Sequence, residues 1–158
     1  MRGRRIFALA AAAALVLAAP AIACTVILPV PGEGETLAQV AFRQDGLHQR
    51  RLRGEATAVY LARVTPARDG FYFRATVPIE GEQPPRRAEV RPGPDCEPSS
   101  PAPGELRIVF ARRVRPADDF WRPWRWGRQV VIGSRRPAEV ADLGLARALR
   151  DAAARVRR

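Results

Sequence analysis

The chain of 158 residues contains no lysine, one histidine, two cysteines and three serines. Without lysine, Schiff-base catalysis at a lysine side chain is excluded. One histidine and two cysteines are too few to build a metal site from several ligands of these types. The sequence has no internal repeat, and its longest apolar run is too short and too rich in alanine to indicate a membrane span. We therefore expect neither a metal nor a cofactor.

Groups suited to acid–base or nucleophilic catalysis are also scarce. His48 lies beside arginines on a predicted helix surface, where a solvated histidine is expected rather than a general base. The three serines have no nucleophile-elbow motif around them. The adjacent acids Asp118 and Asp119 are interpreted as solvated counter-charges of nearby arginines, as are Glu80 and Glu82 on either side of a turn glycine. We expect no catalytic residue, and hence no enzyme.

The net charge of +11 comes entirely from arginine and is unevenly distributed. Residues 1–23 carry three arginines and no acid, residues 24–111 carry 11 arginines and 11 acids, and residues 112–158 carry 13 arginines and 5 acids. The three segments therefore contribute +3, zero and +8. This pattern predicts a neutral body with a basic C-terminal third, which is where a binding surface should be sought.

Residues 1–23 have the pattern of a secretory signal peptide. Arginines near the N-terminus precede the apolar stretch Ile6–Ala19, and Pro20 then interrupts the helical pattern. The segment Ala21–Ala23 has small residues at both positions that a signal peptidase requires. We expect an exported protein, periplasmic or extracellular, whose mature chain starts at Cys24. A buried or membrane-anchoring N-terminal helix is the alternative.

Two chemistries remain open at Cys24. Two cysteines in an exported chain form one disulfide by default, here between Cys24 and Cys96, and closing so long a loop would stabilise the fold by about 4 kcal/mol. Alternatively, Ala21-Ile22-Ala23-Cys24 is an imperfect lipobox, in which case an acylated Cys24 would anchor the protein to a membrane. Acylation would leave Cys96 as an unpaired thiol, which favours the disulfide.

The mature chain has a helix at each end and several short strands between them. Thr36–Arg51 is predicted to be a helix capped by Thr36, with Gly46 as a possible early end, and Leu143–Val156 is a helix with Asp142 as its N-cap. The predicted strands are Thr57–Thr65, Phe71–Ile79, Arg87–Arg91, Leu106–Phe110 and Gln129–Ile132. Short strands with flanking helices indicate a mainly β fold, namely a small barrel with helices packed on it.

Several motifs occur in an order that is typical of one family. Cys24 and the first helix precede A-T-A-V-Y-L-A-R-V-T at 56–65 and F-Y-F-R-A-T-V-P-I-E-G at 71–81. P-D-C-E-P around Cys96 then precedes P-G-E-L-R-I-V-F-A at 103–111. In these features the chain resembles the netrin-like modules related to tissue inhibitors of metalloproteases, which include small bacterial secreted proteins.

The resemblance covers residues 24–111 and implies an OB-like five-stranded barrel domain with Cys24 bridged to Cys96. Residues 112–158 would then be a basic extension that contains the last strand and the C-terminal helix. In the inhibitors, the α-amino group and carbonyl of the first cysteine ligate the catalytic zinc of a protease. Cys24 is the only residue onto which this role can be carried, and a purely structural Cys24 is the alternative.

The segment F-W-R-P-W-R-W-G-R at 120–128 is the strongest binding candidate. Its candidate residues are Trp121, Arg122, Trp124, Arg125, Trp126 and Arg128. Indole rings suit a membrane interface and guanidinium groups suit anionic headgroups. The same two chemistries suit nucleic acids, although export argues against a nucleic-acid partner. In the alternative interpretation, the tryptophans pack on the barrel and the arginines extend into solvent.

Three functions follow from these patterns. The main hypothesis is an exported, non-enzymatic binding module that contacts a partner protein or an anionic envelope surface through residues 112–158. One alternative is a metalloprotease inhibitor that acts through its mature N-terminal residue, Cys24. The other is a structural protein of the envelope, anchored as a lipoprotein through Cys24.

Overall fold

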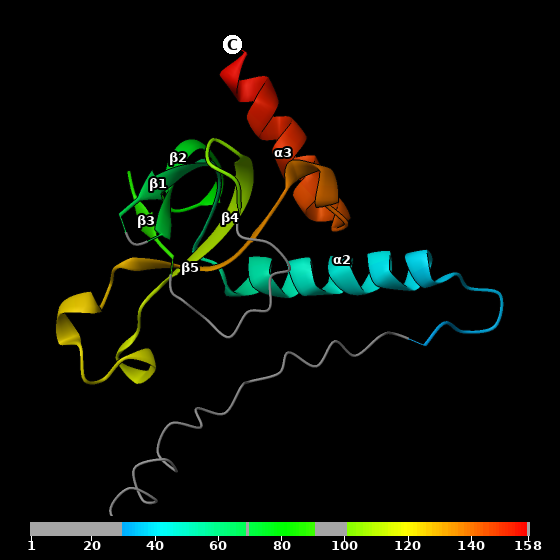
Figure 1. Cartoon of the computed structure of the whole chain (residues 1–158), viewed down its shortest axis with the longest axis horizontal. Coiled ribbons are helices and arrows are strands. Elements are labelled where there is room, and N and C mark those ends of the chain that lie inside the picture. The colour runs from blue at the N-terminus through cyan, green and yellow to red at the C-terminus, as the bar shows by residue number, and fades with distance from the viewer. Residues whose placement is uncertain (1–29, 69, 91–100, 158) are drawn as a thin grey trace, which may run out of the picture.

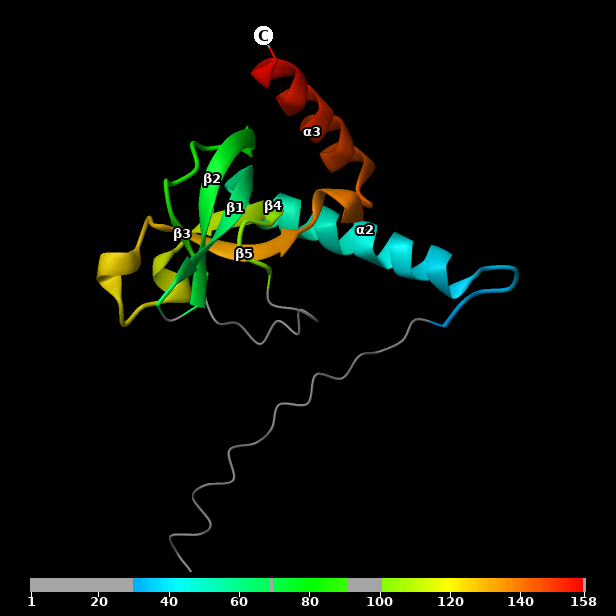
Figure 2. The same cartoon turned by 45° about the horizontal axis from the view of Figure 1, so that its top comes forward.

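The computed structural model describes residues 30–68, 70–90 and 101–157 (Figure 1). The strands are β1 (Ala58–Ala67), β2 (Gly70–Gly81), β3 (Ala88–Glu89), β4 (Leu106–Arg113) and β5 (Gln129–Arg135). The helices are α2 (Leu37–Glu55) and α3 (Leu143–Val156), with short 3-10 helices η1 (Pro116–Asp118), η2 (Pro123–Arg125) and η3 (Pro137–Glu139). In both views the β4–β5 connection, drawn in yellow, lies at the end of the molecule away from α3 (Figures 1 and 2).

The strand pairing corrects the expected fold class, a mainly β, OB-like five-stranded barrel with one disulfide. Four long strands form an antiparallel sheet in the order β2-β1-β4-β5. Of the predicted strand Arg87–Arg91, the described residues form only the two-residue β3. This short strand pairs with β2 and is joined to β5 by a single parallel pair, Glu89 with Val130. The strand order is then β1-β2-β3-β5-β4. Pro84 and Pro85 just before β3, and Pro92 after it, lack the N–H donors that a longer strand needs.

The helices contribute far more to the architecture than a mainly β class implies. The α2 and α3 helices contain 19 and 14 residues, against 39 residues in the five strands together. Both helices also contribute to a hydrophobic core. The class is therefore mixed α and β, and the prediction of a mainly β, regular five-stranded barrel is wrong.

Register irregularities bend the sheet where β1 pairs with β2. Ala58 of β1 lies opposite Ala111 of β4 in an uninterrupted register, whereas Thr76 and Ile79 of β2 have no partner residue in β1. The hydroxyl of Thr76 donates a hydrogen bond to the carbonyl of Leu61, 3.0 Å away. An extra residue in one strand bends and twists the pair, so these two positions help the sheet to curl.

Two hydrophobic cores lie on opposite faces of the curled sheet. The inner core consists of Ala58, Tyr60, Ala62, Val64, Phe73, Ala88, Val109 and Ala111. The core between the sheet and the helices consists of Leu52, Val59, Ile79, Ile108, Phe110, Leu145 and Ala152. Alternate residues of β1 and β4 therefore enter different cores. This explains why both strands are nearly continuous apolar runs in the sequence.

The prediction of a first helix is confirmed, but Gly46 does not end it. Thr36 Oγ1 accepts a hydrogen bond from the backbone N–H of Gln39, whose side chain accepts one from the N–H of Thr36, which is a complete capping box. The helix continues through Gly46 to Glu55. A Cβ at Gly46 would lie 3.2 Å from the carbonyl oxygen of Ala141, so the missing side chain lets the segment before α3 approach the helix.

The predicted C-terminal helix is confirmed, with Asp142 as its N-cap. Leu145 and Ala152 are its buried residues, and both belong to the core between the sheet and the helices. Together with the pairing of β5 and β4, this places residues 129–156 in the same folded unit as residues 58–113. The connection between β4 and β5 projects from that unit (Figures 1 and 2).

Several predictions concern residues outside the described ranges. These are the signal peptide at residues 1–23 and the disulfide or lipid at Cys24, with its partner Cys96. They stay predictions from the sequence. Within the described part of the chain, no helix is long and apolar enough to cross a membrane.

Candidate functional site

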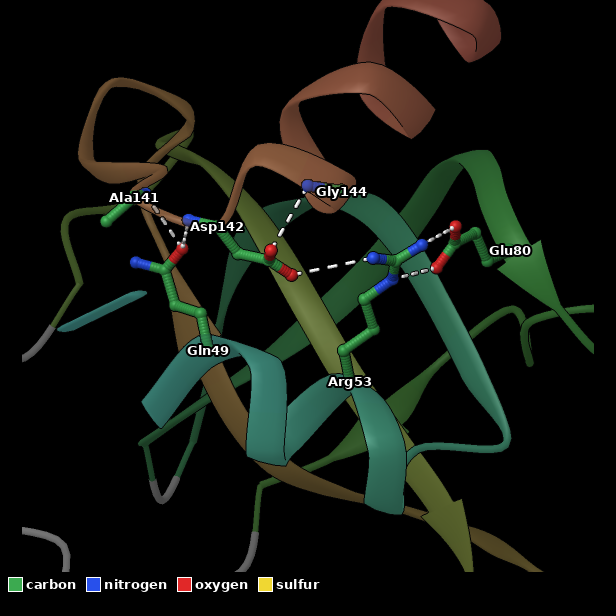
Figure 3. Close-up of polar contacts among 6 residues, drawn as sticks. All are labelled: Gln49, Arg53, Glu80, Ala141, Asp142 and Gly144. Carbon is green, nitrogen blue, oxygen red and sulfur yellow. Dashed lines mark hydrogen bonds and ion pairs between the residues drawn. The ribbon is translucent and has the colours of Figure 1, made fainter. Parts of the chain in front are cut away.

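A buried polar junction connects α2 to the start of α3 (Figure 3). Gln49 is fully buried, and its amide nitrogen donates to the carbonyl of Glu139 at 2.7 Å. Its amide oxygen accepts from the backbone N–H groups of Ala141 and Asp142 at 2.9 and 3.2 Å. One glutamine thus supplies partners for three backbone groups in the segment that leads into α3, and its two bonds to Ala141 and Asp142 are buried.

Arg53 extends the same junction to β2. Its guanidinium donates from Nε and Nη2 to the two carboxylate oxygens of Glu80, each at 2.6 Å, and Nη1 lies 3.5 Å from Asp142 Oδ2. These contacts, above all the hydrogen bonds to Glu80, raise the pKa of Arg53. We call Gln49, Arg53, Glu80 and Asp142 the helix junction. Its groups are occupied with one another across α2, β2 and α3, so its role is to hold these elements together.

Other buried or acidic groups offer no catalytic arrangement in the described part of the chain. No three His, Cys, Asp or Glu side chains there are grouped to hold a metal ion. His48 is exposed on α2, as expected. Burial in the inner core raises the pKa of the Tyr60 phenol, whose hydroxyl has no hydrogen-bond partner, so this phenol stays protonated at neutral pH.

The connection from Val114 to Arg128 contains all six candidate binding residues, and we call it the Arg/Trp loop. Its two ends are joined, since the N–H of Val114 donates to the carbonyl of Arg128 and the N–H of Gly127 donates to the carbonyl of Val114. Val114 itself is buried and anchors the loop to the body. The 3-10 helices η1 and η2 each start with a proline, whose fixed φ suits the first position of a helical turn.

The aromatic side chains of this loop face solvent. The exposed fractions are 67% for Phe120, 85% for Trp121, 66% for Trp124 and 39% for Trp126. The rings of Phe120 and Trp121 meet edge to face, with centroids 5.4 Å apart. The alternative interpretation, in which the tryptophans pack on the barrel, is therefore wrong for Trp121 and Trp124, whereas the Trp126 ring is mostly covered. A cluster of exposed aromatic rings on a loop with fixed ends is typical of a contact surface.

Acidic side chains brace the loop from within. Asp118 accepts a hydrogen bond from Arg112 Nη1 at 2.6 Å and another from the backbone N–H of Arg115 at 3.0 Å. These two bonds, the first most strongly, lower the pKa of Asp118. The indole N–H of Trp126 donates to the carbonyl of Asp119 at 3.0 Å. The predicted role of Asp118 as a counter-charge fits this geometry, but the carboxylate is mostly buried rather than solvated.

The three candidate arginines differ in their surroundings. Arg125 is mostly buried, and its Nη1 lies 3.7 Å from Asp119 Oδ2. Arg122 and Arg128 are exposed, and no side-chain ion pair is described for either. Arg125 thus belongs to the bracing of the loop, whereas Arg122 and Arg128 present their charge to solvent beside the aromatic rings.

Sequence reasoning missed the arginines that support the loop from β4. Arg112 binds Asp118, and Arg113 donates from Nη1 to the carbonyl of Gly127 at 2.8 Å and from Nε to both oxygens of Glu82. The bonds with Glu82 raise the pKa of Arg113 and lower that of Glu82. The excess of arginine after residue 111 was a signal for these residues, but the charge count does not show which arginines are braces and which are free to bind.

The loop therefore combines exposed aromatic rings, two exposed guanidinium groups and a braced backbone at one end of the molecule. Comparison of the chain with protein-family models, with curated proteins and with solved structures gave no match, so the interpretation of this surface rests on its own residues.

Proposed function

We propose that this protein is an exported, non-enzymatic binding module whose Arg/Trp loop binds an anionic lipid surface of the cell envelope. The observation that carries the proposal is the exposure of Phe120, Trp121 and Trp124, each about two-thirds exposed or more. Indole rings partition to the interface of a bilayer, and aromatic rings left in water gain free energy when they leave it. A lipid interface is the surface that receives both rings and cations.

Charge complementarity selects an anionic surface over a neutral one. Arg122 and Arg128 flank the exposed rings and are not engaged by described carboxylates. Each arginine near an anionic surface contributes about 1 kcal/mol. The excess of +8 over residues 112–158 adds attraction at longer range, which salt screens over about 10 Å at 0.1 M. The proposal therefore demands both an anionic lipid and a strong dependence on ionic strength.

Vesicle co-sedimentation tests the proposal with the full mature protein. We expect binding to vesicles that contain phosphatidylglycerol, weak binding to pure phosphatidylcholine, and a steep loss of binding as salt is raised. The double variant Arg122→Gln with Arg128→Gln should reduce the binding, because it removes the two exposed charges beside the rings. Arg50→Gln with Arg150→Gln is the matched control, since both arginines are exposed on helices.

Three results would contradict the membrane proposal. They are equal binding to neutral and anionic vesicles, binding that does not respond to salt, and no binding to either type of vesicle. The last result would favour a protein partner for the loop, and the same arginine variants would then test that contact.

Export and the state of Cys24 are part of the proposal and depend on the sequence alone. Intact mass of the secreted protein distinguishes the forms. A chain that starts at Cys24 and weighs two hydrogens less than its reduced form supports a disulfide with Cys96. An acyl increment indicates a lipoprotein, and it also removes the free amine that the inhibitor alternative requires of Cys24.

A further inference from the structure

Three arginines form a row across neighbouring strands of the sheet. Arg63 of β1 lies directly opposite Arg74 of β2. In the next ladder Phe73 pairs with Ala88. Arg87, the residue before β3, therefore continues the row beside Arg74. We call Arg63, Arg74 and Arg87, whose side chains are all exposed, the arginine row.

The arginine row lies on the outer face of the curled sheet. Ala62 and Phe73 belong to the inner core. Because side chains alternate along a strand, the residues that follow them, Arg63 and Arg74, point to the outer face. Near the start of β1, Val59 on the same face is covered by the helices, which lie to the right of β1 and β2 in both views (Figures 1 and 2). The arginine row lies beyond this cover and is open to solvent.

No carboxylate that the structure describes is paired with the arginine row. Nη1 of Arg63 donates to the carbonyl of Gly104 at 3.2 Å. The guanidinium of Arg87 lies over the ring of Tyr72, 4.6 Å from its centroid, which orders this cation without neutralising it. Like charges directly opposite each other destabilise a sheet. The fold thus retains uncompensated positive charge here, which indicates a surface that meets negative charge on a partner.

The geometry of the row favours an extended anion over a small one. Neighbouring strands are about 4.8 Å apart, so the row is about 10 Å long. The contacts of Arg63 and Arg87 hold these two side chains at opposite ends of the row, so one small anion cannot meet all three guanidinium groups. The row continues to the half-buried Leu106, which lies opposite Arg63 in β4. An apolar side chain therefore borders the cations.

We propose that the arginine row binds an acidic peptide segment of a partner protein. Guanidinium groups pair with carboxylates through two parallel hydrogen bonds, and arginine clusters are a recurring means of recognising acidic motifs. A peptide also brings apolar side chains to pack on Leu106, which a phosphate polymer lacks. The surface goes beyond the proposed function, since it requires neither the Arg/Trp loop nor a lipid.

Fluorescence anisotropy tests the surface with a labelled peptide in which glutamate and leucine alternate. We expect saturable binding, and about tenfold weaker binding of the same peptide with glutamine in place of glutamate. Arg74→Glu should weaken binding of the acidic peptide about tenfold, because it reverses the charge at the centre of the row. Arg50→Glu is the matched control, since it makes the same change of net charge at an exposed position of α2.

The melting temperature separates loss of the surface from loss of the fold. Arg74→Glu places a carboxylate opposite Arg63, so its melting temperature should equal or exceed that of the wild type while peptide binding falls. Arg74→Gln, which removes the charge without reversing it, should give a smaller loss of binding at an unchanged melting temperature.

Several outcomes would overturn the proposal. They are no saturable binding of the acidic peptide by the wild type, equal binding of the glutamine peptide, and equal losses in Arg74→Glu and Arg50→Glu, since net charge alone would then explain the binding. Binding of polyphosphate through the row, without binding of the peptide, would assign the surface to a phosphate polymer instead. Trp121→Ala should bind the peptide like the wild type, and a loss there would move the contact to the Arg/Trp loop.

Discussion

In the helix junction, Arg53 is one-third exposed and places two N–H groups at 2.6 Å from the carboxylate of Glu80. In the Arg/Trp loop, Arg122 and Arg128 are exposed beside tryptophan rings and have no described acidic partner. The two regions therefore use the same residue type in different ways. At the junction the arginine stabilises the fold, and at the loop it remains available for binding.

The two regions also differ in the free-energy cost of removing a polar side chain. A buried polar group whose partner is removed loses its hydrogen bond and does not regain water, whereas an exposed group is hydrated before and after the change. Substitutions at the helix junction should therefore change stability and leave the binding of the folded protein intact. Substitutions of the exposed side chains in the loop should do the opposite.

The largest effect is expected for Gln49→Ala. The change leaves the carbonyl of Glu139 and the N–H groups of Ala141 and Asp142 without their side-chain partner, which should lower the free energy of unfolding by about 3 kcal/mol. Gln44→Ala, an exposed glutamine of the same helix, is the control. Urea denaturation followed by circular dichroism measures both. If Gln49→Ala lowers the free energy of unfolding no more than Gln44→Ala does, the hydrogen bonds of Gln49 do not stabilise the fold.

Arg53→Gln should have the next largest effect. It breaks the paired hydrogen bonds to Glu80 and the contact with Asp142, at a cost of about 1–2 kcal/mol because the site is partly solvated. Arg50→Gln, exposed on the same helix, should be neutral within about 0.5 kcal/mol. The same denaturation measurement checks this pair, and equal stability of the two variants would show that Arg53 has no structural role.

Trp121→Ala should weaken binding and leave stability nearly unchanged. The ring is 85% exposed, so the free energy of unfolding should change by less than about 0.5 kcal/mol. The affinity for anionic vesicles should fall about tenfold, because the ring no longer enters the bilayer interface. Phe42→Ala on α2 is the matched control, because that ring is 60% exposed at a distance from the loop in sequence and in fold. Vesicle titrations should show no loss for the Phe42 variant. Equal losses for both variants would indicate unspecific apolar adsorption.

The smallest effect is expected when the pH is lowered, which should loosen the Arg/Trp loop. The pKa of Asp118 is lowered, chiefly by its hydrogen bond from Arg112, so its ionised form stabilises the folded loop above its ordinary pKa of 3.8. That contribution is lost as the pH falls through the lowered value. Tryptophan fluorescence anisotropy should therefore decrease at acidic pH, and Asp118→Asn should have low anisotropy already at neutral pH. An Asn variant that titrates like the wild type would assign the change to Glu82 or Glu105, whose pKa values are also lowered.

Local patterns in the sequence predicted the helices and most strands, because capping residues and alternation act over a few residues. Asp142 at the start of α3 and Thr36 at the start of α2 are such signals. Gly46 was misleading, since its close approach to Ala141 depends on tertiary packing. The extent of β3 and the balance of helix to strand also depend on tertiary contacts, and they were predicted wrongly.

The sequence predicted which residues form the candidate site, but not whether their side chains are exposed. The interleaved tryptophans and arginines at 120–128 identified the segment, yet their spacing does not distinguish packed rings from exposed ones. The hydrogen bonds of Arg112 with Asp118, and of Arg113 with Glu82 and Gly127, join different elements of the fold. No local pattern could have shown them.

The three tryptophans of the chain all lie in the Arg/Trp loop, so intrinsic fluorescence reports on that loop alone. The most direct test is a titration with phosphatidylglycerol vesicles that carry brominated acyl chains as quenchers. The account predicts a blue shift of the emission, quenching by the bromines, and reversal of both in high salt. Unchanged emission and no quenching, in a protein that still sediments with the vesicles, would contradict it, because another surface would then be making the contact.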